Sequence, residues 1–331
     1  MNETRDIQSI FMTGGAGFLG KHLMRWFAAN HPNVRFTVFS RDEGKHAVAR
    51  HEFPQHTYIL GDVRDSDRVE LAMAGHQVVI HAAALKYVPQ CEDFPSEAIA
   101  TNIDGSRNVA ISAIKNHVSR VIGISTDKAC SPENVYGQTK RIMERLFQEA
   151  DGWSDTYFNL VRYGNVIAST GSVIPIFREQ ARQGNLIVTN PLMTRFWLTA
   201  TDAVLMIANV MSFPAEYRAT IMINRLAATD LLTVAYAAAE LETGMTRADL
   251  EGSKDFTVTI VGGRGGEKVH EDLLSPTEAR QTERIDKTML LYPPGRTPTT
   301  TWDDAHIYTS NTPDHWIESE ELKGMIEEAN E

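Results

Sequence analysis

The chain has 331 residues, and 32 Lys and Arg against 43 Asp and Glu give it a formal net charge of −11. This acidic balance argues against a nucleic-acid binder, because phosphates attract a positive surface. No apolar run approaches the roughly 20 residues that cross a bilayer, and the first residues lack the pattern of a signal peptide. Cys91 and Cys130 are the only cysteines. We therefore expect a cytoplasmic protein with no disulfide framework, no metal site, and no membrane or nucleic-acid partner.

Up to about Ser169 the sequence alternates short β-rich runs with longer amphipathic stretches. Strands are expected at Ile10–Thr13, Val34–Phe39, Thr57–Leu60, Val78–His81, Val121–Ser125 and Phe158–Val161. Helices are expected at Leu19–Ala29, Ile99–Ile114 and Val135–Glu149. Strands that alternate with helices pair in parallel through right-handed crossovers. The sequence therefore predicts an α/β fold with a Rossmann-type doubly wound parallel sheet.

After Ser169, glycines and prolines separate shorter elements, among them a helix at Asp202–Met211 and a strand at Ala219–Ile223. A polar segment around Pro293–Asp304 precedes an acidic helix near the end of the chain. We expect residues 1–172 to form a dinucleotide-binding domain, to which later segments can return. Residues 173–331 are expected to form mainly a smaller substrate-binding lid.

A glycine-rich run, Thr13–Gly20, lies between the first predicted strand and the first predicted helix. Glycine lets the backbone turn tightly and approach a pyrophosphate, which then faces the amides at the positive end of the helix. The predicted cofactor contacts are Gly14, Gly17, Phe18, Leu19 and Gly20. A plain structural turn is the alternative, but its place at the first β–α junction favours dinucleotide binding.

The end of the second predicted strand bears on which dinucleotide binds. An Asp or Glu at this point holds a ribose 2′-hydroxyl, whereas an Arg favours a 2′-phosphate. Ser40 and Arg41 supply a hydroxyl and a guanidinium here, so NADP is preferred over NAD. In the alternative, Arg41 is solvated and Asp42 or Glu43 binds the ribose. Asp62, after the third strand, either contacts the adenine amino group or caps a turn.

Candidate catalytic groups are concentrated between Thr126 and Lys140. Tyr136 and Lys140 are four residues apart at the start of a helix, so they share one face. Tyrosine acts as a base near neutral pH only if its pKa falls by about three units, which takes about 4 kcal/mol. A nearby ammonium and an oxidised nicotinamide together provide this stabilisation. An ordinary Tyr–Lys pair on a helix surface is the alternative, which the glycine turn and Thr126 at a strand end make less favourable.

Taken in order, these motifs resemble the extended short-chain dehydrogenase/reductase superfamily over nearly the whole chain. The sharper resemblance is to the soluble, inverting UDP-N-acetylglucosamine 4,6-dehydratases. It rests on Ser40–Glu43, His81–Lys86, Thr126–Ala129, Pro132, Asn134, Tyr136–Gly137, Thr139–Lys140, Arg162–Val166, Met193–Trp197 and Gly266–Glu271. Sugar-nucleotide 4-epimerases usually place small hydroxyl residues where Asp127 and Lys128 stand.

The resemblance implies a redox-neutral loss of water. Tyr136 takes the proton of the sugar 4-hydroxyl while hydride leaves carbon 4 for NADP⁺. Lys128, if neutral, removes the proton on carbon 5, and Asp127, if protonated, donates to the departing 6-hydroxyl. Hydride then returns to carbon 6, and a proton returns to carbon 5 from the opposite face. Both residues need pKa values that burial has moved toward neutrality.

The resemblance also implies the remaining site residues and the assembly. The catalytic set is Thr126, Asp127, Lys128, Tyr136 and Lys140. Beyond the glycine turn, the cofactor is expected to contact Ser40, Arg41, Lys45, Asp62, Val63, Ala82, Ala83, Ala84, Lys86, Asn102, Tyr136 and Lys140. The UDP-sugar is expected to contact Lys86, Lys128, Asn165, Val173, Arg195, Arg264 and Glu267, with the two arginines on the diphosphate. Proteins of this kind pair through a four-helix interface, so we expect a homo-oligomer, from a dimer up to a hexamer.

Two other functions stay open. A nucleotide-sugar epimerase that acts at carbon 4 or carbon 2 uses the same hydride step, and a non-catalytic protein can sense NADP(H) with the same fold. The Asp127–Lys128 pair favours the dehydratase over the epimerase. The presence of Tyr136 and Lys140 beside that pair counts against a sensor without chemistry.

Overall fold

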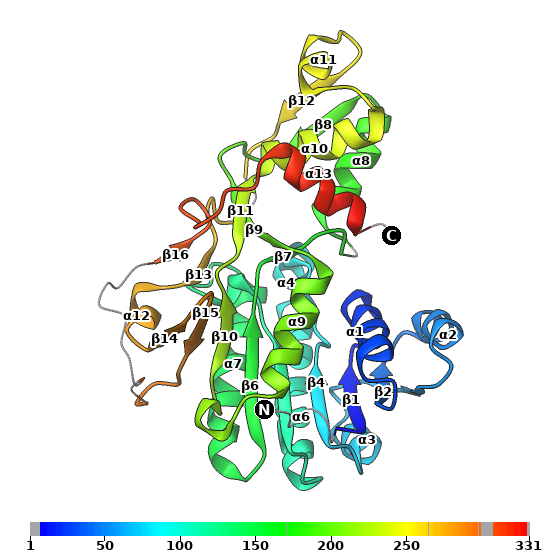
Figure 1. The fold of residues 1–331 in the computed structure, drawn as a ribbon, viewed down its shortest axis with the longest axis vertical. Coiled ribbons are helices and arrows are strands. Elements are labelled where there is room, and N and C mark those ends of the chain that lie inside the picture. The colour runs from blue at the N-terminus through cyan, green and yellow to red at the C-terminus, as the bar shows by residue number, and fades with distance from the viewer. Residues whose placement is uncertain (1–6, 170, 264, 297, 299–306, 330–331) are drawn as a thin grey trace.

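The computed structural model describes residues 7–169, 171–263, 265–296, 298 and 307–329. In this part of the chain, nine strands form one sheet in the order β14-β15-β10-β6-β5-β4-β1-β2-β3 (Figure 1). Their bounds are β1 Ser9–Thr13, β2 Arg35–Ser40, β3 Thr57–Leu60, β4 Val78–His81, β5 Arg120–Ile124, β6 Tyr157–Arg162, β10 Ile221–Asn224, β14 Thr282–Ile285 and β15 Thr288–Leu291. The strands from β10 to β3 run parallel, and β15 and β14 extend one edge by antiparallel pairing.

The sheet is doubly wound, because β2 and β3 extend it on one side of β1 while β4, β5 and β6 extend it on the other. This confirms the predicted fold class. Helices lie on both faces. On one face α1 (Phe18–Asn30) packs against α9 (Ala200–Met211). On the other, α6 (Gly105–Lys115) packs between α3 (Ser66–Met73) and α7 (Val135–Ala150), so β4 is buried along its whole length.

The predicted elements are found with bounds that differ by a few residues at most, with one difference in kind. The helix predicted at Ile99–Ile114 consists of the end of α5 (Pro95–Ile99), a π-helical turn at Ala100–Asp104, and α6. At Gly105 an added Cβ would lie 2.6 Å from Val63 Cγ2, so the helix passes close to the loop after β3. Hydrophobic periodicity does not reveal such a widened turn, which frequently marks a functional site.

A smaller body lies beyond the carboxyl ends of the parallel strands, where the chain leaves β6 (Figure 1). It holds the sheet β11-β9-β7 and the parallel pair β12-β8. Its elements are β7 Asn165–Val166, α8 Val173–Arg182, β8 Asn185–Val188, β9 Thr194–Leu198, β11 Ala227–Asp230, α10 Leu231–Thr243, α11 Arg247–Gly252, β12 Thr257–Ile260 and α13 Ser319–Glu328. Phe177, Trp197 and Ile326 belong to its own buried core, which is distinct from the core of the large sheet.

Later parts of the chain return to the large body. β10, β14 and β15 complete its sheet, although all three follow residue 172 in sequence. The remaining elements are α2 Glu43–Glu52, α4 Val88–Asp93, β13 Asp272–Leu274, α12 Pro276–Ala279 and β16 Tyr308–Thr309, with short 3₁₀ turns at Asp127–Ala129, Asp151–Trp153 and Ala215–Tyr217. Within the described residues, no helix has the length and apolar character needed to span a membrane.

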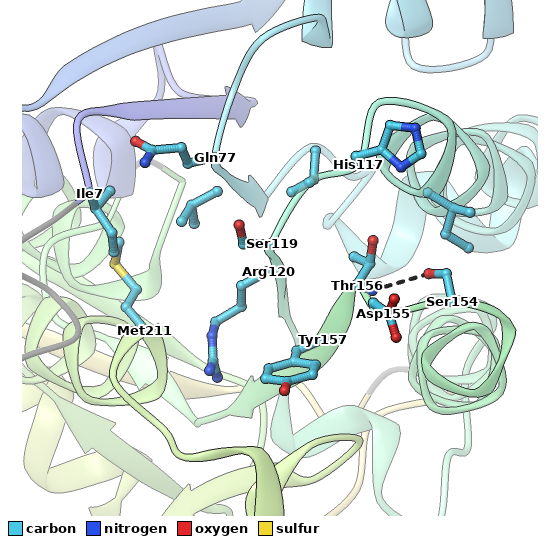
Figure 2. Close-up of a pocket in the computed structure, with 13 residues that line it drawn as sticks. Ile7, Gln77, His117, Ser119, Arg120, Ser154, Asp155, Thr156, Tyr157 and Met211 are labelled. Atoms are coloured by element: carbon cyan, nitrogen blue, oxygen red, sulfur yellow. Dashed lines mark hydrogen bonds between the residues drawn. The ribbon is translucent and has the colours of Figure 1, made fainter.

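A cavity of about 830 Å³ opens at the amino ends of the parallel strands (Figure 2). Gln77, Ser119 and Thr156, which line it, directly precede β4, β5 and β6. Ligands of doubly wound sheets bind outside the carboxyl ends of the strands. This cavity therefore lies at the opposite edge of the sheet from the loops that carry the predicted site.

Candidate active site

The glycine turn joins β1 to α1 and leaves the start of the helix open. Gly14 has φ of +70°, and a Cβ there would lie 2.9 Å from the Ala83 amide nitrogen. Gly17 occupies the N-cap position, and no side chain caps α1. Phe18–Leu19 begin the helix, and a Cβ at Gly20 would collide with the turn itself. The uncapped amides and the bare backbone fit the pyrophosphate of a dinucleotide.

The end of β2 carries the groups predicted to select the dinucleotide. Arg41 Nη1 lies 3.4 Å from Asp62 Oδ2, across the ends of β2 and β3. Ser40 Oγ forms a hydrogen bond with the His46 side chain of α2. Asp42 caps α2 by accepting from the Lys45 amide at 2.9 Å, and the Lys45 ammonium lies 3.0 Å from the same carboxylate. Asp42 is thus engaged at the start of its helix, while Arg41 lies across the strand ends.

Two further predicted cofactor contacts, Lys86 and Val63, follow β4 and β3 in the chain. Burial, and next the charge of Lys45, lower the pKa of Lys86, which places these two lysines in one electrostatic environment. Val63 is buried against the π-helical turn. Burial raises the pKa of Asp62, but hydrogen bonds from Arg64 outweigh it and hold that pKa below its usual range. Asp62 therefore stays an ionised acceptor.

The segment after β4 is fixed between the glycine turn and α7. Two amides of Ala82–Ala84 donate to Thr13, one to its carbonyl and one to its hydroxyl, each at 3.2 Å. Asn102, in the π-helical turn, accepts from the Leu85 amide at 2.8 Å and donates to the Leu85 carbonyl at 2.9 Å. Its amide also donates to Thr139 Oγ1 at 3.0 Å. Asn102 is thus a bridge that fixes the loop beside the expected dinucleotide.

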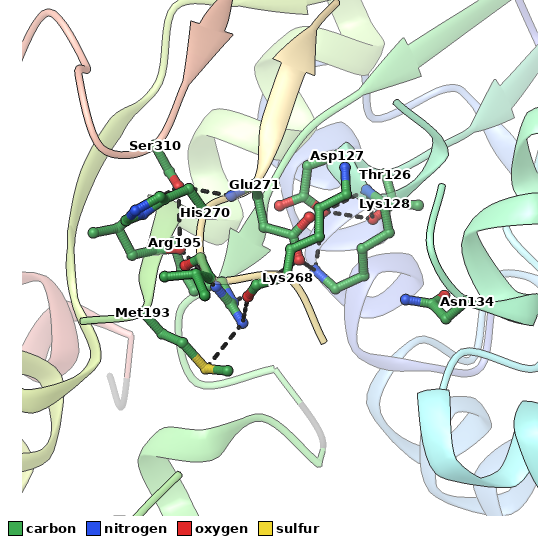
Figure 3. Close-up of polar contacts among 12 residues, drawn as sticks. Thr126, Asp127, Lys128, Asn134, Met193, Arg195, Lys268, His270, Glu271 and Ser310 are labelled. Carbon is green, nitrogen blue, oxygen red and sulfur yellow. Dashed lines mark hydrogen bonds and ion pairs between the residues drawn. The ribbon is translucent and has the colours of Figure 1, made fainter. Parts of the chain in front are cut away.

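The Asp127–Lys128 pair lies in a tight turn that follows β5 (Figure 3). Lys128 Nζ donates to Asp127 Oδ1 at 3.1 Å, and the Lys128 amide donates to the same oxygen at 2.8 Å. Thr126 Oγ1 donates to it as well, at 2.9 Å. Asp127 is fully buried, while the Lys128 side chain retains 19% of its exposure. Burial and several hydrogen bonds distinguish this pair from an exposed ion pair in a loop.

A second carboxylate, Glu271, faces the same ammonium and was not singled out from the sequence. Its Oε1 lies 3.4 Å from Lys128 Nζ, and only 3% of the residue is exposed. Burial lowers the pKa of Lys128, but Asp127 and Glu271 outweigh burial and hold that pKa above its usual range. The expectation that burial moves Lys128 toward neutrality is therefore wrong in this structure, since two anions stabilise the ammonium.

Tyr136 lies in the first turn of α7, which Asn134 caps. Asn134 Oδ1 accepts from the Gly137 amide at 2.8 Å, and its Nδ2 donates to the Gly266 carbonyl at 2.8 Å. Lys140 Nζ, one turn on, donates to the Ile124 carbonyl at the end of β5 at 2.6 Å. Helix α7 is therefore tied both to the large sheet and to the loop that precedes β13.

The electrostatics of the tyrosine differ from expectation. Burial raises the pKa of Tyr136 to about 12, although the Lys128 charge and a hydrogen bond with Thr126 act in the other direction. Burial lowers the pKa of Lys140 to about 8. The chain by itself therefore does not lower the tyrosine pKa, and the expected lowering, which also requires an oxidised nicotinamide, stays a prediction. The lysine whose charge lowers the pKa of Tyr136 is Lys128, whereas the amine of Lys140 is hydrogen-bonded to the end of β5.

The predicted substrate residues are spread over the smaller body and its connections. Arg195, in β9, donates to the carbonyls of Thr194, Lys268 and Val269 at 2.7, 2.9 and 3.1 Å. Its Nε lies 3.9 Å from Glu271 Oε1. The Arg195 guanidinium is therefore anchored beside Glu271 and Lys128 rather than extended into solvent.

The other predicted substrate residues lie in separate elements of the structure. Asn165 pairs in register with Trp197 in β7 and β9, and Val173 begins α8. Glu267 is partly buried in the loop before β13, and Arg264 lies outside the described residues. Among the described residues, no three His, Cys, Asp or Glu side chains are grouped as a metal site requires.

A dinucleotide turn at β1, a Tyr–Lys helix after β5 and a buried Asp–Lys pair between them define an enzyme of the short-chain dehydrogenase/reductase kind. The sequence matches the family described as polysaccharide biosynthesis protein over residues 10–293, and the chain belongs to that family.

Individual relatives carry two kinds of name. A UDP-N-acetylglucosamine 4,6-dehydratase (inverting) of Campylobacter jejuni is 35% identical over 293 residues, which cover 86% of this chain and 83% of that protein. A UDP-glucose 4-epimerase of Rickettsia canadensis is 38% identical over 287 residues, which cover 84% and 81%. The X-ray structure of Pen from Bacillus thuringiensis has a TM-score of 0.88 at 32% identity and covers 98% of both chains.

Proposed function

We propose that this protein is an NADP-dependent UDP-N-acetylglucosamine 4,6-dehydratase that inverts carbon 5. Its product is then a UDP-2-acetamido-2,6-dideoxy-4-keto-hexose. The observation that carries the proposal is the buried Asp127–Lys128 hydrogen bond of 3.1 Å beside Tyr136. An epimerase needs only a group that moves the 4-hydroxyl proton. A dehydratase needs an additional base and acid, and this pair supplies both.

The resting pair becomes a base and an acid through one proton shift. In the structure, Lys128 is the ammonium and Asp127 the carboxylate, since two carboxylates raise the lysine pKa. Transfer of one proton along the 3.1 Å hydrogen bond gives a neutral amine and a carboxylic acid. The number of protons in the pair is unchanged. This shift reaches the protonation states that elimination requires without a change in bulk pH.

The protons of the elimination then balance within the Asp127–Lys128 pair. If the positive charge of an oxidised nicotinamide stabilises its phenolate, Tyr136 takes the proton of the 4-hydroxyl as carbon 4 is oxidised, and the resulting ketone acidifies the proton on carbon 5. Lys128 Nζ takes that proton, the electrons of the C–H bond form the double bond to carbon 6, and the C6–O bond breaks. Asp127 gives its proton to the departing hydroxyl, which leaves as water. The pair ends as ammonium and carboxylate, the state that the structure stabilises.

The glycine turn and the loops after β2, β3 and β4 fit a nicotinamide dinucleotide. A bound nicotinamide supplies the hydride acceptor for carbon 4 and the hydride donor for carbon 6. NADP is favoured over NAD because Asp42 is engaged as the cap of α2, whereas Arg41 lies across the strand ends. The positive charge of Lys45, which lowers the pKa of Lys86, and that of Lys86 itself add to the attraction for a 2′-phosphate.

A cytoplasmic homo-oligomer completes the proposal. Large apolar side chains are exposed on the connected helices α5, α6 and α7, at Ile99 (46%), Ile111 (38%) and Ile142 (43%), with Phe94 (61%) beside them. Isoleucines on neighbouring helices favour pairing with a second copy. Analytical ultracentrifugation of the wild type and of Ile142→Glu tests this assembly, and a monomeric wild type contradicts it.

One incubation tests the reaction. The protein is mixed with UDP-N-acetylglucosamine and catalytic NADP⁺ in heavy water, and the sugar nucleotide is examined by mass spectrometry and NMR. A dehydratase lowers the mass by one water and places solvent deuterium at carbon 5. Lys128→Ala should lower the rate of water loss at least about 100-fold while NADP binding persists. Lys323→Ala, on the surface of α13, is the matched control and should behave as the wild type.

An epimerase is the second candidate, because the Rickettsia canadensis relative with that name is 38% identical. It predicts a new sugar isomer at carbon 4 or carbon 2 with unchanged mass in the same incubation. A protein that only senses NADP(H) predicts cofactor binding with no change in the sugar. Water loss by the wild type, absent from Lys128→Ala, excludes both.

A further inference from the structure

Glu271 enters the site from a segment far from the catalytic turn in sequence. It directly precedes β13, which lies in the C-terminal third of the chain. Its backbone amide donates to Ser310 Oγ at 2.9 Å, and Ser310 Oγ in turn lies 2.7 Å from Thr194 Oγ1 (Figure 3). Thr194 also hydrogen-bonds His270 Nδ1 at 2.9 Å. The backbone of Glu271 is thus held in place by a polar cluster from β9, the residue after β16 and the segment before β13.

The carboxylate of Glu271 lies between two cations. Its Oε1 is 3.4 Å from Lys128 Nζ and 3.9 Å from Arg195 Nε. Within the described residues, the second oxygen of Glu271 and Oδ2 of Asp127 are buried without a hydrogen-bond partner. A carboxylate is costly to bury unless it is paired, so its position is set by charge rather than by packing.

We propose that Glu271 is a positioning residue that acts through Lys128, by stabilising the positive charge that forms on Nζ as the amine takes the carbon 5 proton. The inference deepens the proposed dehydration and rests on it for its catalytic consequence. The elimination converts a neutral pair, amine and acid, into ammonium and carboxylate. An anion 3.4 Å from Nζ lowers the free energy of the second state more than that of the first. Glu271 therefore makes Lys128 a stronger base.

All charged and titratable groups that face Lys128 from the surrounding elements bear on this role. Asp127 lies on the same turn, Glu271 precedes β13, Arg195 is on β9, and Tyr136 is on α7. The charge of Arg195 lowers the pKa of Lys128, and the Glu271 carboxylate lies between the two cations. Without the Glu271 charge, Lys128 is left with one anion and a neighbouring guanidinium, so its basicity falls.

The test compares Glu271→Gln and Glu271→Asp with the matched control Glu242→Gln. Glutamine keeps the size of the side chain and removes its charge, and aspartate keeps the charge. Glu242 pairs with Arg178 and Arg182 in the smaller body, away from the catalytic turn. The first readout does not depend on turnover: NMR titration of the lysine side chains, with Lys128→Met to assign the signal, gives the Lys128 pKa. It should fall by about one unit or more in Glu271→Gln, by little in Glu271→Asp, and not at all in Glu242→Gln.

The second readout is catalytic. The resting pair is already ammonium and carboxylate, so Glu271 opposes the proton shift that precedes elimination by more than it stabilises the charge that is forming in the transition state. Glu271→Gln should therefore raise kcat by up to about 10-fold, with KM within about three-fold, and should shift the acid limb of the pH–rate profile to lower pH. Reduction of the dinucleotide in a single turnover, which reports oxidation at carbon 4, should be retained. Glu271→Asp should keep the kcat of the wild type. An unchanged Lys128 pKa in Glu271→Gln overturns the inference, and so does an unchanged pH profile. If the wild type releases no water, the proposed function fails, and the titration still decides whether Glu271 controls the charge of Lys128.

Discussion

Cys130 Sγ donates to Glu278 Oε2 at 3.1 Å, which ties the end of the catalytic turn to a buried ion cluster. In that cluster the Arg162 guanidinium lies 2.7 Å from Glu144 and 2.9 Å from Glu278, and no part of Arg162 is exposed. Ser125 Oγ, just before the turn, donates to Glu144 at 2.6 Å. One cluster thus holds both ends of the segment that presents Asp127 and Lys128.

Arg162→Met should therefore destabilise the protein strongly. Among the described residues, it leaves the buried carboxylates of Glu144 and Glu278 with only the partly exposed Arg141 as a cationic partner, and breaking a buried pair costs about 3–5 kcal/mol. Urea unfolding monitored by circular dichroism measures the loss. Arg182→Met is the control, since this exposed arginine pairs with Glu242 on the surface and should cost less than about 1 kcal/mol. Equal losses in the two variants contradict a structural role for the cluster.

Gly14→Ala should abolish dinucleotide binding as well as strain the backbone. The added Cβ meets the Ala83 amide at 2.9 Å, where a bound pyrophosphate needs the turn to stay close to the loop. Gly75→Ala separates the two effects, because Gly75 has φ of +77° but open space around the new Cβ. That control should cost about 1–2 kcal/mol of stability and leave NADP affinity unchanged. Calorimetric titration decides; retained binding by Gly14→Ala removes the turn from the cofactor site.

Arg41→Ala should weaken NADP selectively. Loss of a charge-assisted hydrogen bond to a 2′-phosphate costs about 1.5–3 kcal/mol, or roughly 10- to 150-fold in Kd. NAD lacks that phosphate, so its affinity should change by less than about three-fold. Arg50→Ala is the control: Arg50 lies on α2 with its guanidinium over the Tyr58 ring of β3, and its removal should leave both affinities unaltered. A parallel loss for NADP and NAD shows that Arg41 does not select the dinucleotide.

The sequence was informative where local patterns dominate. β3 and β4 have the predicted bounds, because short apolar runs between turn residues are typical of buried strands. The glycine turn was predicted from its position in the sequence, between a predicted strand and a predicted helix. The Asp127–Lys128 turn came from resemblance, and the structure adds that it is a buried 3₁₀ turn.

The charges of the site were not predictable from local patterns. Against the effect of burial, the pKa of Lys128 is raised first by its neighbour Asp127 and then by Glu271, which follows Lys128 by more than a hundred positions and reaches it only through the tertiary fold. The amine of Lys140 is taken up by the Ile124 carbonyl, a contact that helical spacing from Tyr136 does not reveal. The expected pKa of Lys128 was wrong for this reason, whereas the lowering of the Tyr136 pKa, which requires a bound nicotinamide, stays a prediction.

Lys140 should give the stability of the protein a distinctive dependence on pH. Burial lowers its pKa from 10.5 to about 8 in the folded protein, so between these values the unfolded chain binds more protons than the folded one. Stability contributed by this position therefore rises with pH through that window, by up to about 3 kcal/mol. The measurement is the difference in unfolding free energy between the wild type and Lys140→Met at intervals from about pH 7.5 to 10. That difference should shift in favour of the wild type as the pH rises. Lys323→Met is the control, since a hydrogen bond with Glu320 raises the pKa of Lys323 and its difference should stay flat over the same range. A flat difference for Lys140→Met as well means that the lysine is not buried against the end of β5 in solution.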